Sequence, residues 1–175
     1  DGLHSTVRAR CFGAVEPLYL GYRSHRFVVD NRDRLVHFTR FLGRGQEVTC
    51  PDNLVTGRRQ NLAHLSGIDF IEGDLADLDV ARRVVQGVDF VLHQAAIPSV
   101  PRSVLDPIAS NRANVEASLN LLVAARDAGV RRVVYAGSSS AYGNTPTLPK
   151  DEGMPTAPLS PYALQKLVAE QYCQL

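Results

Sequence analysis

The sequence predicts an α/β fold, a Rossmann-like doubly wound parallel sheet, and two patterns point to it. From about Arg26 onward, short apolar runs alternate with longer segments of helical periodicity, which is the pattern of βαβ units. The run VVYA at residues 133–136 is apolar at successive positions, as expected for a strand that helices cover on both faces. With 175 residues, 45% of them hydrophobic, the chain can bury the core of one domain.

Each expected element follows from its own periodicity and from the turn residues beside it. Strands are predicted at Arg26–Val29, Glu47–Cys50, Asp69–Glu72, Asp89–His93 and Arg132–Ala136. Helices are predicted at Leu35–Leu42, Ala76–Gln86, Ala109–Ala128 and from Pro161 to the end of the chain. Residues 1–24 show no period and remain unassigned, so the predicted domain spans residues 25–175.

Two helix boundaries are predicted from local chemistry. Small or apolar residues recur through the segment 109–128, and Gly129 then supplies a helix stop. Ser160 is suited to cap the last helix, and Pro161 suits its first position, where no backbone N–H is needed. Tyr162 and Lys166 then lie one turn apart on the same face of that helix.

Composition and charge exclude several classes of protein. The formal net charge of +1 gives no long-range field to attract nucleic acid or an acidic membrane. The cysteines are odd in number and far apart, without the spacing of a zinc site or a disulfide framework: Cys11, Cys50 and Cys173. Neither a membrane-spanning run nor a secretory signal is found. We therefore expect a cytoplasmic protein that holds no metal and has no nucleic-acid or membrane partner.

The strongest functional signal is a set of hydroxyl and amine side chains near the end of the chain. Ser138 follows the strand VVYA, and ligands of doubly wound sheets bind where strands end. An ammonium at Lys166 favours the phenolate form of Tyr162, which suits the pair for proton transfer. The alternative is an exposed tyrosine and lysine on an ordinary helix, but their placement after Ser160-Pro161 favours function.

Three runs carry a resemblance to a known family: VLHQAAIPSVPRSVLDP, AARDAGVRRVVYAGSSSAYGNTPTLPKDE and PLSPYALQKLVAEQYC. They resemble nucleotide-sugar epimerases of the extended short-chain dehydrogenase/reductase family, closest to bacterial UDP-sugar 4-epimerases, over about residues 45–175. The resemblance implies NAD as cofactor, a UDP-sugar substrate and transfer of a hydride from the sugar to NAD and back. Because family members are nearly twice as long, it also implies a fragment truncated before the C-terminal substrate domain.

The resemblance assigns roles to individual residues. It implies that Tyr162 is the base, that Lys166 holds the nicotinamide ribose, and that Ser138 bonds the sugar hydroxyl. Ser139, Ser99 and Arg102 are further candidates for the substrate side. Related dehydratases and decarboxylases carry acidic residues where this chain has Ser139-Ser140-Ala141, so those two chemistries are disfavoured.

Other matching positions are candidates for holding the cofactor. Asp52, with Asn53, matches the acidic residue that bonds the adenosine ribose, although an Asp-Asn pair after a strand is also ordinary turn chemistry. The remaining matches are Asp74 and Leu75 beside the adenine, Ala95 and Ala96 where the backbone approaches the cofactor, and Asn114 near the lysine. Each match has a structural alternative. Asp74 could simply cap a helix, the two alanines could reflect a tightly packed strand end, and Asn114 could make a buried polar contact between helices.

The first βα turn departs from the family pattern. Residues 30–34 read Asp-Asn-Arg-Asp-Arg, whereas the family has glycines that let the backbone reach the pyrophosphate. Asp30 and Asp33 would repel phosphate, and Arg32 and Arg34 would offset only the charge. Two alternatives therefore stay open: a non-catalytic remnant or binding module of the same fold, and a nucleotide-sugar reductase. Asp52 argues against a reductase that uses NADP, since its carboxylate would face the 2′-phosphate.

The oligomeric state is predicted from the same helices. The helical segments 109–128 and 161–175 are long and rich in apolar or small residues. We expect them to form the interface of a homodimer.

Overall fold

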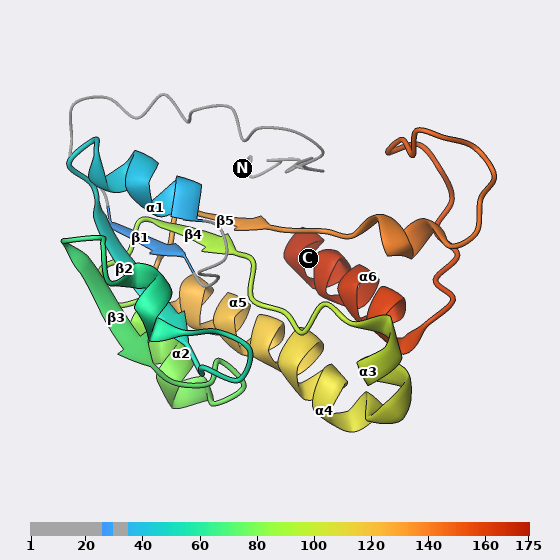
Figure 1. Cartoon of the computed structure of the whole chain (residues 1–175), viewed down its shortest axis with the longest axis horizontal. Coiled ribbons are helices and arrows are strands. Elements are labelled where there is room, and N and C mark those ends of the chain that lie inside the picture. The colour runs from blue at the N-terminus through green and yellow to red at the C-terminus, as the bar shows by residue number, and fades with distance from the viewer. Residues whose placement is uncertain (1–25, 30–34) are drawn as a thin grey trace.

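The computed structural model describes residues 26–29 and 35–175, and these residues form one parallel sheet (Figure 1). Its strand order is β3-β2-β1-β4-β5. The strands are β1 (Arg26–Val29), β2 (Glu47–Asp52), β3 (Ile68–Glu72), β4 (Phe90–His93) and β5 (Arg132–Tyr135). Each neighbouring pair is parallel, and Val28 lies opposite Thr49 on one side and Val91 on the other. The predicted Rossmann-like fold class is confirmed.

Helices connect the strands and continue beyond the last one. They are α1 (Leu35–Leu42), α2 (Leu78–Val84), α3 (Val100–Leu105), α4 (Pro107–Asn111), α5 (Ala117–Asp127) and α6 (Pro161–Gln174). Single turns of 3-10 helix occur at η1 (Arg59–Leu62) and η3 (Ser139–Tyr142). The segment η2 (Arg112–Glu116) is a π-helical turn that joins α4 to α5.

The sheet is covered on both faces, and each face has its own hydrophobic core. Alternate residues of a strand point to opposite faces. Phe90 and Leu92 of β4 therefore pack with Phe38 of α1 on one face, while Val91 packs with Leu121 of α5 on the other. All of β4 is buried, which explains why its sequence is apolar up to the terminal His93. Figure 1 shows α1 on one side of the sheet and α2 and α5 on the other.

The strand order creates a point at which the chain reverses direction across the sheet. The chain passes from β1 to β2 to β3 on one side, then returns so that β4 lies on the other side of β1. Connections that leave β1 and β4 toward opposite sides open a crevice between their carboxyl ends, where ligands of doubly wound sheets bind. The loops after β2, β3, β4 and β5 therefore begin at this edge.

Two expected helices differ from those observed. The helix expected over residues 76–86 is α2, which starts later because Asp77 caps it, its side chain accepting a hydrogen bond from the Asp79 N–H. The helix expected over 109–128 is instead α4, η2 and α5 in succession. Its predicted end is confirmed: Gly129 has a φ of +72°, and the Val130 N–H donates to the Ala125 carbonyl.

The predicted start of the last helix is confirmed as well. The Ser160 hydroxyl accepts a hydrogen bond from the Ala163 N–H at 3.1 Å, and Pro161 occupies the first turn of α6. The serine therefore satisfies one of the backbone donors that a helix start leaves without an intrahelical acceptor.

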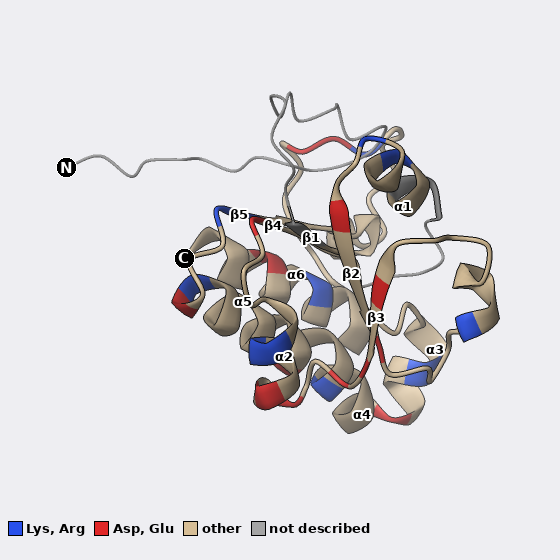
Figure 2. Ribbon diagram, turned by 90° about the vertical axis from the view of Figure 1, so that its left-hand side faces the viewer, with Lys and Arg blue, Asp and Glu red and all other residues tan. Residues whose placement is uncertain are grey.

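Some expectations fall on residues that the structure does not describe. The unassigned segment 1–24 and the first βα turn at residues 30–34 both lie outside the described residues. Within the described ranges, every helix is too short or too polar to cross a membrane. Basic and acidic residues are interspersed over the described ribbon (Figure 2).

Candidate active site

The residues proposed from the sequence gather where the parallel strands end. Asp52 is the last residue of β2, and Asp74 and Leu75 follow β3. Ala95 and Ala96 follow β4, and Ser138 follows β5. Since all these strands run in the same direction, these positions share one edge of the sheet.

Ser138 lies at the start of the short helical turn that follows β5. Its hydroxyl accepts a hydrogen bond from the Ser140 N–H at 3.3 Å and caps η3. The two hydroxyl oxygens of Ser138 and Ser140 lie 2.7 Å apart and share a hydrogen bond. These bonds give the Ser138 side chain a defined direction at the sheet edge.

Tyr162 is positioned by the way α6 begins. Helix α6 packs against β5 and η3, so it lies beside the segment that carries Ser138. The Tyr162 N–H donates to the hydroxyl of Ser103 in α3 at 3.1 Å. Ser103 is fully buried and donates in turn to the Val100 carbonyl at 2.8 Å. Two serines, one from α3 and one preceding α6, therefore fix the helix start that presents the tyrosine.

Lys166 lies one turn further along α6 and is almost completely buried. Only 3% of its surface is exposed, although an ammonium group is costly to remove from water. Its Nζ atom lies 4.1 Å from the centroid of the Tyr135 ring, at the end of β5. A charged side chain kept inside the protein beside the ligand edge is a candidate for function.

Asn114 lies in the π-helical turn and joins three parts of the chain. Its Oδ1 accepts from the Ile97 N–H at 2.8 Å, in the loop after β4. Its Nδ2 donates to Gln165 Oε1 of α6 at 3.0 Å and to the Ser110 hydroxyl at 3.3 Å. π-Helical turns are rare and are frequent at functional sites. Asn114 therefore connects the loop after β4 to the helix that carries Lys166. This is the buried polar contact that the sequence offered as the structural alternative to a role in cofactor binding.

Replacement of Asn114 by alanine is expected to lower the free energy of unfolding by about 2–3 kcal/mol, because buried polar partners lose their hydrogen bonds. Urea denaturation followed by circular dichroism measures the change. Asn111→Ala is the matched control, since Asn111 is exposed at the end of α4 and its loss should change stability by roughly 0.5 kcal/mol or less. Equal stability losses in the two variants would contradict the role of Asn114.

The residues proposed for the adenosine side occupy ordered turns. Asp52 Oδ1 accepts from the Leu54 N–H at 2.6 Å, and Asp74 Oδ1 accepts from the Ala76 N–H at 2.9 Å. Asp52 and Asp74 are half-buried, and Leu75 belongs to the hydrophobic core. Turn chemistry and ligand binding are compatible here, since a carboxylate has two oxygens.

Four of the proposed residues lie at the periphery. Asn53 and Ser139 are exposed. Arg102 is exposed on α3, and the hydroxyl of Ser99 caps that helix by accepting from the Arg102 N–H at 3.2 Å. Asn53 and Ser139 follow the ends of β2 and β5, and Ser99 and Arg102 follow β4.

Several buried polar residues behind the site have no role predicted from the sequence. His93, the last residue of β4, is fully buried, and its Nε2 lies 2.8 Å from the Ser118 hydroxyl. Ser118 and Gln165 are buried too. One signal was available, because a histidine that ends an otherwise apolar strand is a polar group that needs a partner.

The pKa of the Cys173 thiol, near the C-terminal end of α6, is set by burial and by two nearby charges. Burial raises its pKa to about 11, while the nearby Lys166 ammonium lowers it and Glu170 raises it. Cys173 therefore stays a thiol at neutral pH and is a poor nucleophile. Among the described residues, no histidine, cysteine and carboxylate side chains are grouped as metal ligands.

Comparison with known proteins identifies the family. Residues 36–175 match the NAD dependent epimerase/dehydratase family. The chain belongs to this family. The resemblance seen in the sequence is thereby confirmed, and the family is one that depends on NAD.

Relatives of this epimerase/dehydratase chain include sugar-nucleotide enzymes. A UDP-glucose 4-epimerase of Mycolicibacterium smegmatis is 38% identical over 141 residues, or 78% of this chain and 45% of the relative. The UDP-N-acetylglucosamine 4-epimerase of Methanobrevibacter ruminantium M1, solved with UDP-N-acetylmuramic acid, is 33% identical with a TM-score of 0.76, covering 86% of this chain and 49% of that one. The dTDP-glucose 4,6-dehydratase DesIV of Streptomyces venezuelae, solved with NAD bound, is 32% identical with a TM-score of 0.76, covering 84% and 50%. The chain spans about half the length of these relatives.

Proposed function

We propose that this chain is the NAD-binding part of a nucleotide-sugar epimerase of the UDP-hexose 4-epimerase type. The observation that carries the proposal is the buried Lys166, one helical turn after Tyr162, on a helix packed against the strand end that leads to Ser138. Epimerase relatives support the reaction type. A dehydratase is also similar to the chain, but Ser139-Ser140-Ala141 offers no carboxylate for eliminating water.

The chain's own residues supply proton transfer and orientation. In the proposed reaction Tyr162 acts as the base: its phenolate oxygen takes the proton of the sugar hydroxyl, becoming a phenol, and later returns it, while the Ser138 hydroxyl holds that sugar oxygen. NAD, when bound, supplies the hydride chemistry of the reaction. We propose that substrate contacts also come from Ser99, Arg102 and Ser139.

The chemistry of the donor set fits NAD over most of the edge. Lys166 and Tyr162 would hold the nicotinamide ribose, and the half-buried Asp52 carboxylate, with Asn53, would accept hydrogen bonds from the hydroxyls of the adenosine ribose. Asp74 and Leu75 would lie beside the adenine, and Ala95 and Ala96 leave room for the backbone to approach. The sequence of residues 30–34 does not fit equally well, because it lacks glycine at the pyrophosphate turn.

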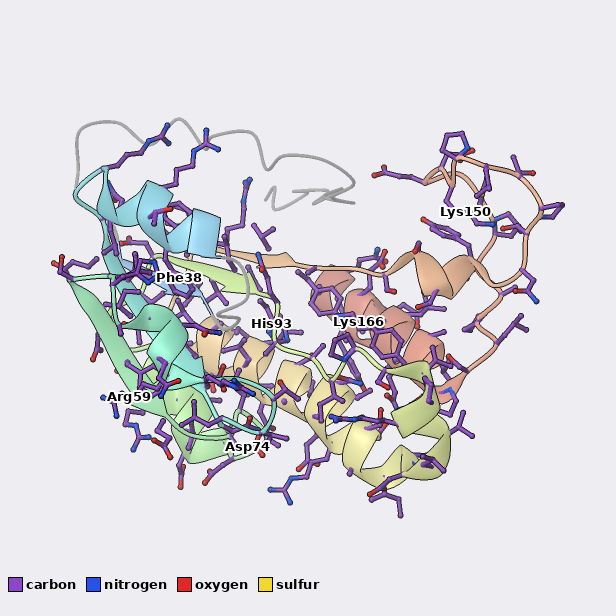
Figure 3. The ribbon with its side chains drawn as sticks, viewed as in Figure 1. Phe38, Arg59, Asp74, His93, Lys150 and Lys166 are labelled. Carbon is purple, nitrogen blue, oxygen red and sulfur yellow. The ribbon has the colours of Figure 1, made fainter. Side chains whose placement is uncertain are left out.

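Calorimetric titration with NAD tests the proposal. We expect a Kd below about 1 mM. Lys166→Met should weaken binding by about tenfold or more, because it removes a charge-assisted hydrogen bond to the ribose. Lys150→Met is the matched control, since Lys150 is the other lysine of the chain and lies in the loop after η3, far from Lys166 (Figure 3). The Lys150 variant should bind NAD as tightly as the wild-type chain.

The same titration separates the alternatives. No binding of NAD would favour a remnant or binding module that has kept the fold but lost the cofactor turn. Tighter binding of NADP than of NAD would favour a reductase. The Asp52 carboxylate leads us to expect the opposite order.

We also propose that the protein is a cytoplasmic homodimer that pairs through residues 109–128 and 161–175. The exposure of Leu164 and Tyr172 on α6, at 51% and 38%, supports an apolar contact there. Sedimentation equilibrium measures the mass, and a monomer at micromolar concentration would contradict the dimer.

A further inference from the structure

The buried ammonium of Lys166 needs a partner that offsets the loss of water. Lys166 is 3% exposed, and its Nζ lies 4.1 Å from the centroid of the Tyr135 ring. The face of an aromatic ring carries negative electrostatic potential and attracts a cation, and the attraction is stronger where water is excluded. Tyr135 is itself 7% exposed, so the contact lies inside the protein.

Tyr135 also contacts the backbone of the helix that carries the lysine. Its hydroxyl lies 3.4 Å from the Lys166 carbonyl oxygen, to which it donates a long hydrogen bond. The ring therefore contacts Lys166 at two points, the ammonium and the main chain. Because Tyr135 ends β5, it connects the rigid sheet directly to the middle of α6.

A second buried ring holds Tyr135 in place. The His93 ring lies with its centroid 5.4 Å from that of Tyr135, at an interplanar angle of 46°. His93 and Lys166, both labelled in Figure 3, each contact the Tyr135 ring. His93 comes from the end of β4, the strand next to β5. The ends of two adjacent strands, β4 and β5, therefore supply two rings in contact, and the Tyr135 ring lies against the lysine.

The orientation of His93 is fixed by hydrogen bonds that extend to the π-helical turn. The Ser118 hydroxyl donates to the Asn114 carbonyl at 2.7 Å. With its single proton used in this way, the Ser118 oxygen must accept from His93, so that His93 Nε2 carries hydrogen. Asn114, Ser118, His93 and Tyr135 thus form a continuous buried series that ends at Lys166.

We propose that Tyr135 is a positioning residue for Lys166, its ring face holding the ammonium at the place where the lysine meets the nicotinamide ribose. The role at the ribose rests on the proposed function, whereas the contact between ring and ammonium does not. The part of Tyr135 proposed to hold the ammonium is its ring, since the ring face lies 4.1 Å from Lys166 Nζ, whereas the hydroxyl bonds to the main-chain carbonyl of Lys166 at 3.4 Å. Phenylalanine should therefore replace it, and leucine should not.

The chain is suited to a direct test because it has two lysines, Lys150 and Lys166. In protein labelled with carbon-13 lysine, protons held over a ring face resonate at higher field than those of a lysine in solvent. We expect the Hε signals of Lys166 to lie upfield of those of Lys150, and to show nuclear Overhauser effects to the Tyr135 ring protons. Lys150→Arg assigns the two signals.

Variants at Tyr135 then separate the ring from its hydroxyl. The upfield shift should persist in Tyr135→Phe and be lost in Tyr135→Leu, while the Lys150 signals stay unchanged in both. A wild-type Lys166 signal at the position of Lys150, without contacts to the ring, overturns the proposal even if the leucine variant does not fold. So does a shift that survives unchanged in a folded Tyr135→Leu protein.

Cofactor binding measures the consequence of this contact. Tyr135→Leu should weaken NAD binding about tenfold, the order expected for loss of a desolvated cation–π contact, and Tyr135→Phe should restore it. If wild-type protein shows the shifted Lys166 signals but binds no NAD, the proposed function fails and the ring contact stands. If NAD binds equally well to wild-type and Tyr135→Leu protein, Tyr135 does not position the lysine for the cofactor.

Discussion

Replacing Tyr162 with phenylalanine is expected to slow the interconversion of UDP-glucose and UDP-galactose at least about a hundredfold, because the variant cannot transfer the proton of the sugar hydroxyl. Chromatography of the two sugar nucleotides measures the rate. Tyr172→Phe is the matched control, since it makes the same change on α6 at a tyrosine that is 38% exposed. Its rate should equal that of the wild type.

The assay is designed around the length of the chain. This chain corresponds to less than half of the Mycolicibacterium smegmatis relative. Both substitutions are therefore also made in a chimera, in which the matching segment of this chain replaces the corresponding segment of the relative. NAD should still bind to Tyr162→Phe, because Lys166 continues to hold the ribose. Turnover that is unchanged by Tyr162→Phe in an active protein would refute the role of the tyrosine.

Gly143→Ala is expected to lower the free energy of unfolding by about 3 kcal/mol, for two reasons that add. Gly143 has a φ of +62°, a conformation that strains a residue with a side chain. A Cβ atom at this position would also lie 2.2 Å from the Ala157 carbonyl oxygen, a backbone atom that cannot turn away. The loop after η3 is held at that point by the Ala157 N–H, which donates to the Ala141 carbonyl.

Gly129→Ala is a control that has a positive φ but lacks the close contact. Gly129 has a similar φ of +72°, but nothing lies within 4 Å of a Cβ built on it. Its replacement should therefore cost only the backbone strain, about 1 kcal/mol. Urea denaturation of both variants gives the difference. Equal losses would mean that the loop near Ala157 moves without cost.

Most of the sheet could be predicted from the sequence because its strands are short apolar runs between turn residues. The limits of prediction lie at strand ends. β2 continues through Pro51 to Asp52, although proline cannot donate to a sheet and the predicted strand stopped at Cys50. β5 ends at Tyr135, one residue before the predicted end, because the next loop begins there.

The helices that line the site were harder to predict. α3 and α4 are short and start at Val100 and Pro107, and short helices depend on tertiary contacts more than on periodicity. The π-helical turn at η2 could not be predicted, because the 3.6-residue hydrophobic period used to identify helices does not distinguish it from a regular α-helix. Tyr162, Lys166 and Ser160 could be placed because capping chemistry fixes the start of α6 within a few residues.

The buried polar partners of the site could not be predicted in detail. The hydrogen bond from Asn114 to Gln165 joins residues 51 positions apart, and that from Tyr162 to Ser103 spans 59. Such pairs are set by how helices pack and not by local spacing. The family resemblance identified Asn114 but gave no role to Ser103, Ser118 or His93.

The π-helical turn at η2 makes this stretch of chain unusually intolerant of changes in length. A regular helix rotates about 100° per residue, so adding or deleting one residue turns everything before it relative to everything after it. Ser110 bonds to Gln165 at 2.6 Å from one side of η2, while Ser118 holds His93 from the other. Deletion of one residue between Ser110 and Ser118 would leave a regular helix, but the two serines could no longer bond to Gln165 and His93 at the same time.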